Sequence, residues 1–229
     1  LIEYVGTNFR GWQVQKKGKT IQGLIQDKIS KILKEKIILF GSGRTDTGVH
    51  AIEQSAHFDC KNKIPQVERF LKSMNYFLNK DGVTILKVRR RKNSFHARFS
   101  AKMRIYKYII INRVGRPVLE KNRGWHIMKE LDLKLMKKGA KKLIGTKDFS
   151  TFRASSCRAS SPIKTMKLIK IKSSKSKIEI EFRSQSFLQQ QVRSMVGCLK
   201  YLGENKWSLK KFEKILKSKK EFYVLHQLQ

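Results

Sequence analysis

The sequence is poor in acidic residues, cysteine and proline, and it has no long apolar run. Asp and Glu number 17 against 52 Lys and Arg in 229 residues, which leaves a formal net charge of +35. Such a surface attracts polyanions, because binding to a phosphate backbone releases condensed counterions. Nucleic acid is therefore the first partner to consider, and an anionic membrane surface is the main alternative. No stretch approaches the roughly 20 apolar residues of a spanning helix, so we expect no membrane segment.

The three cysteines, Cys60, Cys157 and Cys198, are too few and too widely spaced for a disulfide framework or a paired-cysteine zinc site. We expect free thiols that pack as small hydrophobic side chains, in a protein of the reducing cytoplasm. The chain also lacks a P-loop and a complete dinucleotide-binding motif. We therefore expect no bound cofactor and no metal ion.

The spacing of apolar residues predicts alternating helices and strands, an α+β protein. Helices are predicted near residues 20–34, 65–78, 133–144, 192–202 and 209–216. Strands are predicted near residues 37–40, 55–59, 83–88, 105–111 and 177–183, with a hairpin loop at 172–177. Both halves repeat a similar inventory, and the boundary falls near Ser100. We therefore expect two halves, residues 1–100 and 101–229.

One short stretch, FGSGRTDTGVHA at residues 40–51, places a single carboxylate, Asp46, between glycines and after an arginine. A dinucleotide-binding motif needs glycine where Asp46 stands, since a carboxylate there would repel the pyrophosphate. The triplet DTG also occurs in aspartic proteases, whose chemistry needs two carboxylates that share a proton. Only one copy is present. A protease would therefore have to bring two Asp46 side chains together in a homodimer.

Three other interpretations of this stretch remain. A zinc site could draw on His50, His57, Asp59 and Cys60, but their spacing matches no closed tetrahedral pattern. Asp46 could be a lone nucleophile or base, held by glycine turns, with nearby arginines stabilising its charged form. Aspartate and glycine are also ordinary turn residues without a chemical role. The stretch alone does not decide between catalysis and a plain turn.

Four further segments accompany this stretch in a fixed order along the chain. The set consists of YVGTNFRGWQ at 4–13, GRTDTGVHA at 43–51, SFHARFSA at 94–101, RIYKY at 104–108 and FLQQQVRSMVG at 187–197. Together the segments resemble the tRNA pseudouridine synthase A family over nearly the whole chain. The resemblance implies two ferredoxin-like halves, with mainly antiparallel sheets, joined around a central basic cleft. It also implies a homodimer.

The resemblance further implies an activity, the isomerisation of uridine to pseudouridine in the anticodon arm of tRNA, at positions 38 to 40, without a cofactor. Asp46 matches the family's catalytic aspartate, and Arg193 matches the arginine that pairs with it. Tyr106 matches the aromatic residue beside the target base. Further substrate contacts are expected from Arg44, His50, Arg98 and Leu225.

Two segments depart from the family pattern. Gln189, Gln190 and Gln191 stand where family members carry histidine or aromatic residues, and the C-terminal tail lacks the family's glycine. Glutamine forms hydrogen bonds but neither titrates near neutrality nor stacks like imidazole. The alternative function is therefore a catalytically silent tRNA-binding or RNA-folding protein with the same charge and fold. The basic run KVRRRK, residues 87–92, is a candidate contact to the RNA backbone under either interpretation.

Overall fold

The computed structural model describes residues 1–61 and 63–218. The chain divides into two compact units, Leu1–Ala101 and Lys102–Gln229. Each unit has its own hydrophobic core, built from its own strands and helices. In the described part of the chain, every helix is too short or too polar to cross a membrane.

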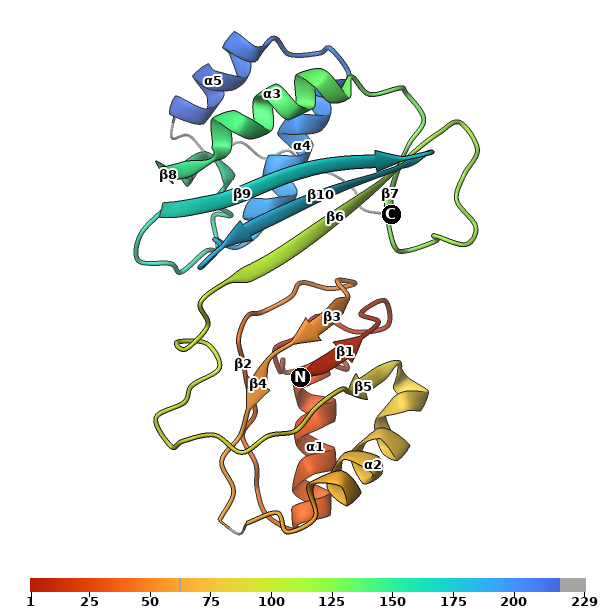
Figure 1. Cartoon of the computed structure of the whole chain (residues 1–229), viewed down its shortest axis with the longest axis vertical. Coiled ribbons are helices and arrows are strands. Elements are labelled where there is room, and N and C mark those ends of the chain that lie inside the picture. Colours follow the sequence, from red (N-terminus) through yellow and green to blue (C-terminus); the bar gives the residue numbers. More distant parts are fainter. Residues whose placement is uncertain (62, 219–229) are drawn as a thin grey trace. The chain divides into compact units, whose positions relative to one another are not determined.

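The first unit is a small antiparallel sheet backed by two helices (Figure 1). Its strand order is β3 (Ala51–Gln54), β1 (Ile2–Tyr4), β5 (Val83–Ile85). A separate antiparallel pair joins β2 (Phe40–Gly41) to β4 (Ala56–His57). The helices are α1 (Ile21–Leu33) and α2 (Val67–Leu78), and a short 3-10 turn, Asn79–Asp81, leads into β5.

Local signals in the sequence set the ends of α1 and the face that it buries. The Thr20 hydroxyl accepts the Gly23 N–H at the start, as N-cap residues do. The helix ends at Lys34, whose φ of 54° lies in the left-handed region. The buried face packs against one face of α2 and against the sheet. The buried residues are Ile21, Ile25 and Ile29 on α1, Phe70, Met74 and Leu78 on α2, and Ile2, Tyr4, Val83 and Ile85 on the strands.

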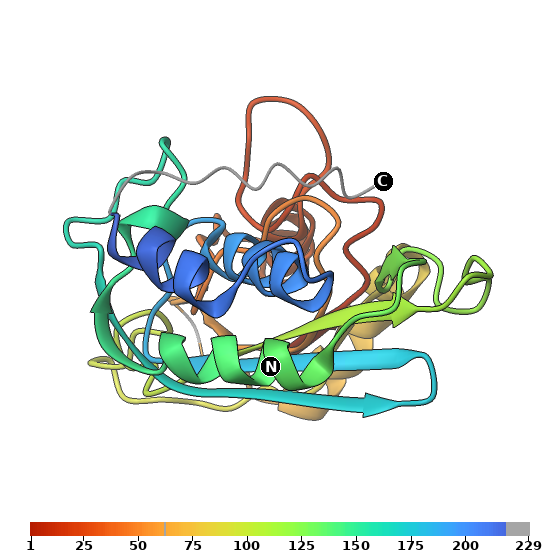
Figure 2. The ribbon, with the colours of Figure 1, turned by 90° about the horizontal axis from the view of Figure 1, so that it is seen from above.

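The second unit has a larger sheet with helices packed on one side of it (Figures 1 and 2). The strand order is β7 (Trp125–Ile127), β6 (Arg104–Asn112), β10 (Lys177–Ser184), β9 (Ile163–Ser174), β8 (Gly145–Asp148). Only β6 and β7 pair in parallel among these neighbours. The helices are α3 (Leu133–Leu143), α4 (Gln191–Gly203) and α5 (Leu209–Lys217), and a 3-10 turn spans Ser150–Phe152.

The expected α+β class with mainly antiparallel sheets is confirmed, and all five predicted helices are present within a few residues of their expected bounds. One strand prediction is wrong. Residues 37–39 form no strand, and pairing begins only at Phe40. The loop predicted at 172–177 is also shorter than expected, because β9 continues to Ser174 and β10 already begins at Lys177. A two-residue turn joins them, with Lys175 at a φ of 51°.

Candidate active site

The loop that carries Asp46 connects β2 to β3 and spans residues 42–50. Hydrogen bonds close its base. The Ser42 N–H donates to the Ser55 carbonyl at 2.8 Å, and the Gln54 amide donates to the Gly43 carbonyl at 2.6 Å. The loop therefore leaves the sheet through a fixed stem.

Two buried aromatic residues hold the loop at Thr45, the residue before Asp46. The backbone N–H of Trp12 donates to the Thr45 carbonyl at 3.0 Å. The Tyr4 and Thr45 hydroxyls are hydrogen-bonded at 2.8 Å. Tyr4 and Trp12 both belong to the core of the first unit. The backbone position of Asp46 is therefore set by the core and not by the loop alone.

Asp46 itself begins a tight turn. The Val49 N–H donates to the Asp46 carbonyl at 3.2 Å, and Gly48 has a φ of +78°, as the third residue of a type II turn requires. The turn also lies against the first unit's N-terminal segment. A Cβ atom added at Gly6 would lie 2.0 Å from the Val49 carbonyl oxygen, a distance that only glycine avoids.

The side chains of the loop differ in their surroundings. Asp46 is half-buried and Arg44 is exposed. Among residues 1–61 and 63–101, nothing forms an ion pair with the Asp46 carboxylate. His50 is half-buried, and its Nδ1 accepts the Gly6 N–H at 3.0 Å. This bond leaves the neutral ring with its hydrogen on Nε2 and gives His50 a role in anchoring the loop.

In the second unit, Tyr106 and Arg193 lie on elements that pack together. Tyr106 is on β6, and its ring meets Phe187 edge-on, with ring centroids 4.9 Å apart. Arg193 is in the first turn of α4 and half-buried. Burial raises the pKa of Tyr108 to about 12, against the opposing effect of the nearby Arg193 charge. Tyr106 and Tyr108 are alternate residues of β6, so the two rings share the face of the sheet that Arg193 approaches.

The three glutamines that depart from the family pattern have different environments. Gln189 and Gln190 are exposed. Gln191 is fully buried, and its Oε1 accepts the Leu188 N–H at 2.8 Å, so it fixes the chain where α4 begins. Gln190 has a φ of +60° and no side-chain cap bond to the helix. Only two of the three glutamines are therefore open to solvent.

The remaining predicted residues lie outside these two regions. Arg98 is exposed in the first unit, with its guanidinium carbon 5.6 Å from the centre of the Phe99 ring. Leu225 lies outside the described residues. The zinc site weighed from the sequence is not formed. Among the residues described, no three or more His, Cys, Asp or Glu side chains gather closely enough to hold a metal ion.

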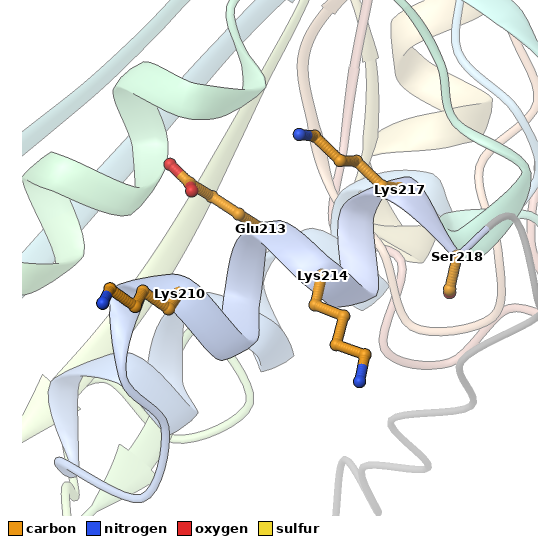
Figure 3. A pocket seen from close by; sticks show the side chains of 5 residues that line it. All are labelled: Lys210, Glu213, Lys214, Lys217 and Ser218. Carbon is orange, nitrogen blue, oxygen red and sulfur yellow. The ribbon is translucent and has the colours of Figure 1, made fainter.

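A shallow hollow on α5 contains none of the predicted site residues. Its lining consists of Lys210, Glu213, Lys214, Lys217 and Ser218. Figure 3 shows these side chains pointing in different directions, so they do not converge on a common ligand. Glu213 is already paired with Lys142 at 2.8 Å. The hollow is therefore not a candidate for the chemistry.

Several residues that shape the site were not identified from the sequence. Tyr4, Trp12, Thr45 and Phe187 all lie in the quoted segments, but their roles depend on contacts between distant positions. The separation of 41 positions between Tyr4 and Thr45 shows why pattern and spacing could not find this pair. Aromatic residues clustered within those segments were the one available signal.

The chain is similar to known tRNA pseudouridine synthases over nearly its whole length. A model of the tRNA pseudouridine synthase family matches residues 1–100 and 140–225. The chain is 69% identical over 220 residues to tRNA pseudouridine synthase A of Pelagibacter ubique, covering 96% of this chain and 89% of that protein. It is 41% identical over 219 residues to tRNA pseudouridine synthase A of Paramagnetospirillum magneticum, covering 96% of this chain and 85% of that protein. The chain therefore belongs to the tRNA pseudouridine synthase family.

Proposed function

We propose that this chain isomerises uridine to pseudouridine in the anticodon arm of tRNA, at positions 38 to 40, with Asp46 as the catalytic carboxylate. Membership of the family supports the general activity, since tRNA pseudouridine synthases are isomerases that act on uridine in tRNA. The matched residues of the family include the whole loop that carries Asp46. The formal charge of +35 suits a polyanionic substrate.

The reaction needs one group at the sugar and a site that holds the detached base. The bond from N1 of uracil to C1′ breaks, the uracil turns, and a bond from C5 to C1′ forms. C5 then loses its proton and N1 gains one. Asp46 acts either as the nucleophile at C1′ or as the base that starts a glycal route. The proton lost from C5 is matched by the proton gained at N1, no electrons are transferred and no bond is hydrolysed. The reaction therefore requires no redox cofactor.

The anchored turn at Asp46 is the observation that carries this proposal. A catalytic carboxylate must be held within a fraction of an ångström of its working position. The hydrogen bonds from Tyr4 and Trp12 to Thr45 fix the residue before Asp46. The Val49 N–H fixes the carbonyl of Asp46. A plain surface turn would not need a buried tyrosine hydroxyl and the backbone N–H of a buried tryptophan for its support.

Arg193 and Tyr106 are proposed to act on the same uridine as Asp46. An arginine guanidinium can pair with a carboxylate through two hydrogen bonds, which favours the carboxylate's charged form. The ring of Tyr106, set edge-on to Phe187, is proposed to lie beside the uracil. Family membership supports both assignments, and each residue occupies an ordered, half-buried position in the second unit.

The other contacts are proposed to recognise the shape and backbone of the anticodon arm. A base in a stem must leave its stack before C1′ can be reached, at a cost of roughly a few kcal/mol. Arg44, exposed two positions before Asp46, is placed to fill the gap or to hold a phosphate. His50, Arg98 and Leu225 are the other proposed substrate contacts, and the run at 87–92 is a proposed contact to the backbone.

We also propose that the protein acts as a homodimer in the cytoplasm. The family resemblance supports the homodimer, and sedimentation of the purified protein tests it. Cys60, Cys157 and Cys198 form no disulfide with one another, which fits a reducing compartment.

The experiment that tests the function is the release of tritium from tRNA labelled at C5 of uridine. Three substrates, each with a single labelled uridine at position 38, 39 or 40, should release tritium, and a tRNA with uridine at none of these positions should not. Release only from another part of the tRNA would contradict the proposed site. Binding without any release would favour the catalytically silent RNA-binding protein.

A further inference from the structure

A group of rings in the first unit has no role in the proposed chemistry. It consists of Phe40, His57, Phe95, His96 and Phe99, and we refer to it as the aromatic–histidine cluster. Its members come from β2, from β4 and from the segment that follows the basic run at 87–92. Three parts of the chain therefore contribute to one surface.

The rings of the cluster form a continuous series of contacts that ends at an exposed ring. The Phe40 and His57 rings stack, with centroids 5.2 Å apart and planes 24° apart. His57 meets His96 at 4.6 Å, and His96 meets Phe99 at 4.4 Å. Phe99 is 75% exposed and Phe40 is 40% exposed. The series begins on ordered strands and reaches solvent at Phe99.

A rigid turn presents Phe99. The Ser100 N–H donates to the His96 carbonyl at 2.8 Å, and the His96 N–H donates to the Ser100 hydroxyl at 3.1 Å. The Arg98 N–H donates to His96 Nδ1 at 3.2 Å. Between these residues, Ala97 is buried and ties the turn to β4, because its N–H donates to His57 Nδ1 at 3.2 Å. The exposure of Phe99 is therefore built into an ordered segment.

The two histidines are held in fixed orientations within this surface. Burial lowers the pKa of His57, and the charge of His96 acts in the same direction, outweighing the opposing effects of Asp59 and the Phe40 backbone. His57 Nδ1 and His96 Nδ1 each accept a backbone N–H, which fixes how both rings are oriented. The cluster therefore offers flat ring faces whose orientations are fixed.

Positive charge surrounds these faces. The Arg98 guanidinium lies 5.6 Å from the centre of the Phe99 ring, and the Arg91 guanidinium lies 5.4 Å from that of Phe95. Aromatic faces flanked by cations are typical of surfaces that stack unpaired bases and hold the adjoining phosphates. A second copy of this chain would bring a further charge of +35 to the same surface, so charge complementarity favours an RNA occupant.

We propose that Phe99, supported by His96, stacks an unpaired nucleobase of the tRNA substrate, with Arg91 and Arg98 facing the phosphates on either side of that base. The proposal rests on the proposed function only in taking tRNA as the substrate. Phe99 is thereby assigned a role in binding and not in catalysis. The base that it stacks is not that of the reacting uridine, so the contact holds the RNA without taking part in the bond changes.

The test compares tRNA binding by the parent with binding by Phe99→Ala. Tyr76→Ala is the matched control, because Tyr76 is an aromatic residue of the same unit that is 81% exposed. We expect Phe99→Ala to weaken tRNA binding about ten-fold or more, as loss of one base stack does. Tyr76→Ala should bind like the parent, and both variants should melt at the parent's temperature. Equal affinity of Phe99→Ala and the parent would overturn the proposal.

Two further variants separate stacking from simple apolar contact. Phe99→Trp should keep the parent's affinity for tRNA. Phe99→Leu should bind tRNA almost as weakly as Phe99→Ala, since leucine has no ring face. Full affinity with leucine would overturn the stacking assignment. Tritium release by the parent is measured alongside. Release by the parent with no effect of Phe99→Ala on binding would refute this proposal and leave the proposed function intact.

The stacked base can be located with abasic substitutions along the anticodon arm. At one unpaired position, removing the base should weaken binding of the tRNA by the parent. On that abasic tRNA, Phe99→Ala should bind no more weakly than the parent does. This loss of additivity identifies the partner of Phe99. Independent effects at every unpaired position would overturn the proposal.

Discussion

The hydroxyl of Tyr4 and the hydroxyl of Thr45 lie 2.8 Å apart, joining the first strand to the loop that carries Asp46. Tyr4 is buried in the core, so this contact transmits the rigidity of the sheet to a loop residue next to the proposed catalytic carboxylate. Together with the Trp12 bond to the Thr45 carbonyl, it holds the loop from both the side chain and the backbone.

Tyr4→Phe removes this hydrogen bond while keeping the ring in the core. We expect a loss of about 1 kcal/mol in the free energy of unfolding, because the half-buried Thr45 hydroxyl loses this hydrogen bond. We also expect slower turnover with unchanged tRNA affinity. Urea denaturation and tritium release measure the two effects. Tyr76→Phe, at an exposed position, should change neither. Parent-like turnover by Tyr4→Phe would show that the contact does not position the loop.

Two glycines near Asp46 should respond very differently to substitution. Alanine at Gly6 places a Cβ atom 2.0 Å from the Val49 carbonyl oxygen, so the loop must move by more than 1 Å. A displacement of that size can slow turnover about 100-fold. Gly48 has open space around its Cα, and its φ of +78° suits asparagine better than other side chains. Gly48→Asn should therefore retain most activity in steady-state assays. Similar losses for both variants would argue against a steric role for Gly6.

The sequence predicts elements well where one periodicity continues without interruption. The five helices follow from apolar residues spaced along one face, as with Met136 and Ala140 on α3. Strand β9 was not predicted, because a bulge breaks its alternation. Arg183 pairs with Leu168 but Ser184 pairs with Met166, so the extra residue Lys167 shifts the pattern. Short strands such as Ala51–Gln54 form only because a distant partner pairs with them.

The sequence motif predicted which loop carries the candidate carboxylate, but it did not predict the contacts that hold this loop. The segment around Asp46 identified the family and the loop. The supporting contacts of Tyr4 join positions far apart in the chain, and pattern alone cannot pair them. The same limit applies to the aromatic–histidine cluster, in which His57 joins Phe40 to His96 across three segments.

The basic run at 87–92 allows a prediction about the salt dependence of tRNA binding. Arg90 already has a partner, since it donates to the Ile64 carbonyl at 2.9 Å, and Arg91, which lies over Phe95, is proposed above to face a phosphate beside the stacked base. Arg89 is exposed. Arg89→Ala should therefore reduce the slope of log Kd against log salt concentration by about 1, as loss of one phosphate contact does.

The control for Arg89 is Lys31→Ala, because Lys31 is paired with Asp27 at 3.1 Å on the exposed side of α1. Titrations of labelled tRNA at several salt concentrations should give this variant the parent's slope. An unchanged slope for Arg89→Ala would remove Arg89 from the contacts to the RNA backbone.

A buried carboxylate at the end of α4 should make the second unit sensitive to acid. Glu204 is only 6% exposed, with its two oxygens 2.8 Å from Lys200 and 3.0 Å from Lys206. Burial alone would raise the pKa of Glu204, but the hydrogen bonds and charges of the two lysines lower it below its ordinary value of 4.5. Its contribution to stability is therefore complete above about pH 4.5 and is lost as the pH falls through the lower pKa of the folded state.

Glu204→Gln should cost about 2 kcal/mol of unfolding free energy at pH 7, since it removes hydrogen bonds to charged groups. The difference from the parent should shrink below pH 4.5, where the unfolded chain binds the proton. Urea denaturation across this pH range measures both effects. Glu213→Gln, which alters an exposed pair with Lys142, should show no measurable loss. A pH-independent difference would contradict the assignment to the Glu204 charge.

The central claim is that Asp46 performs the chemistry, and single-turnover release of tritium from C5-labelled anticodon-arm tRNA tests it most directly. The parent, Asp46→Asn and Asp27→Asn are compared at saturating protein concentration, with tRNA binding measured in parallel. Asn is close to Asp in shape, and Asp27 is a surface carboxylate of α1. We predict that all three bind tRNA alike, that the parent and Asp27→Asn release tritium, and that Asp46→Asn does not. Release by Asp46→Asn at the parent's rate would contradict the account.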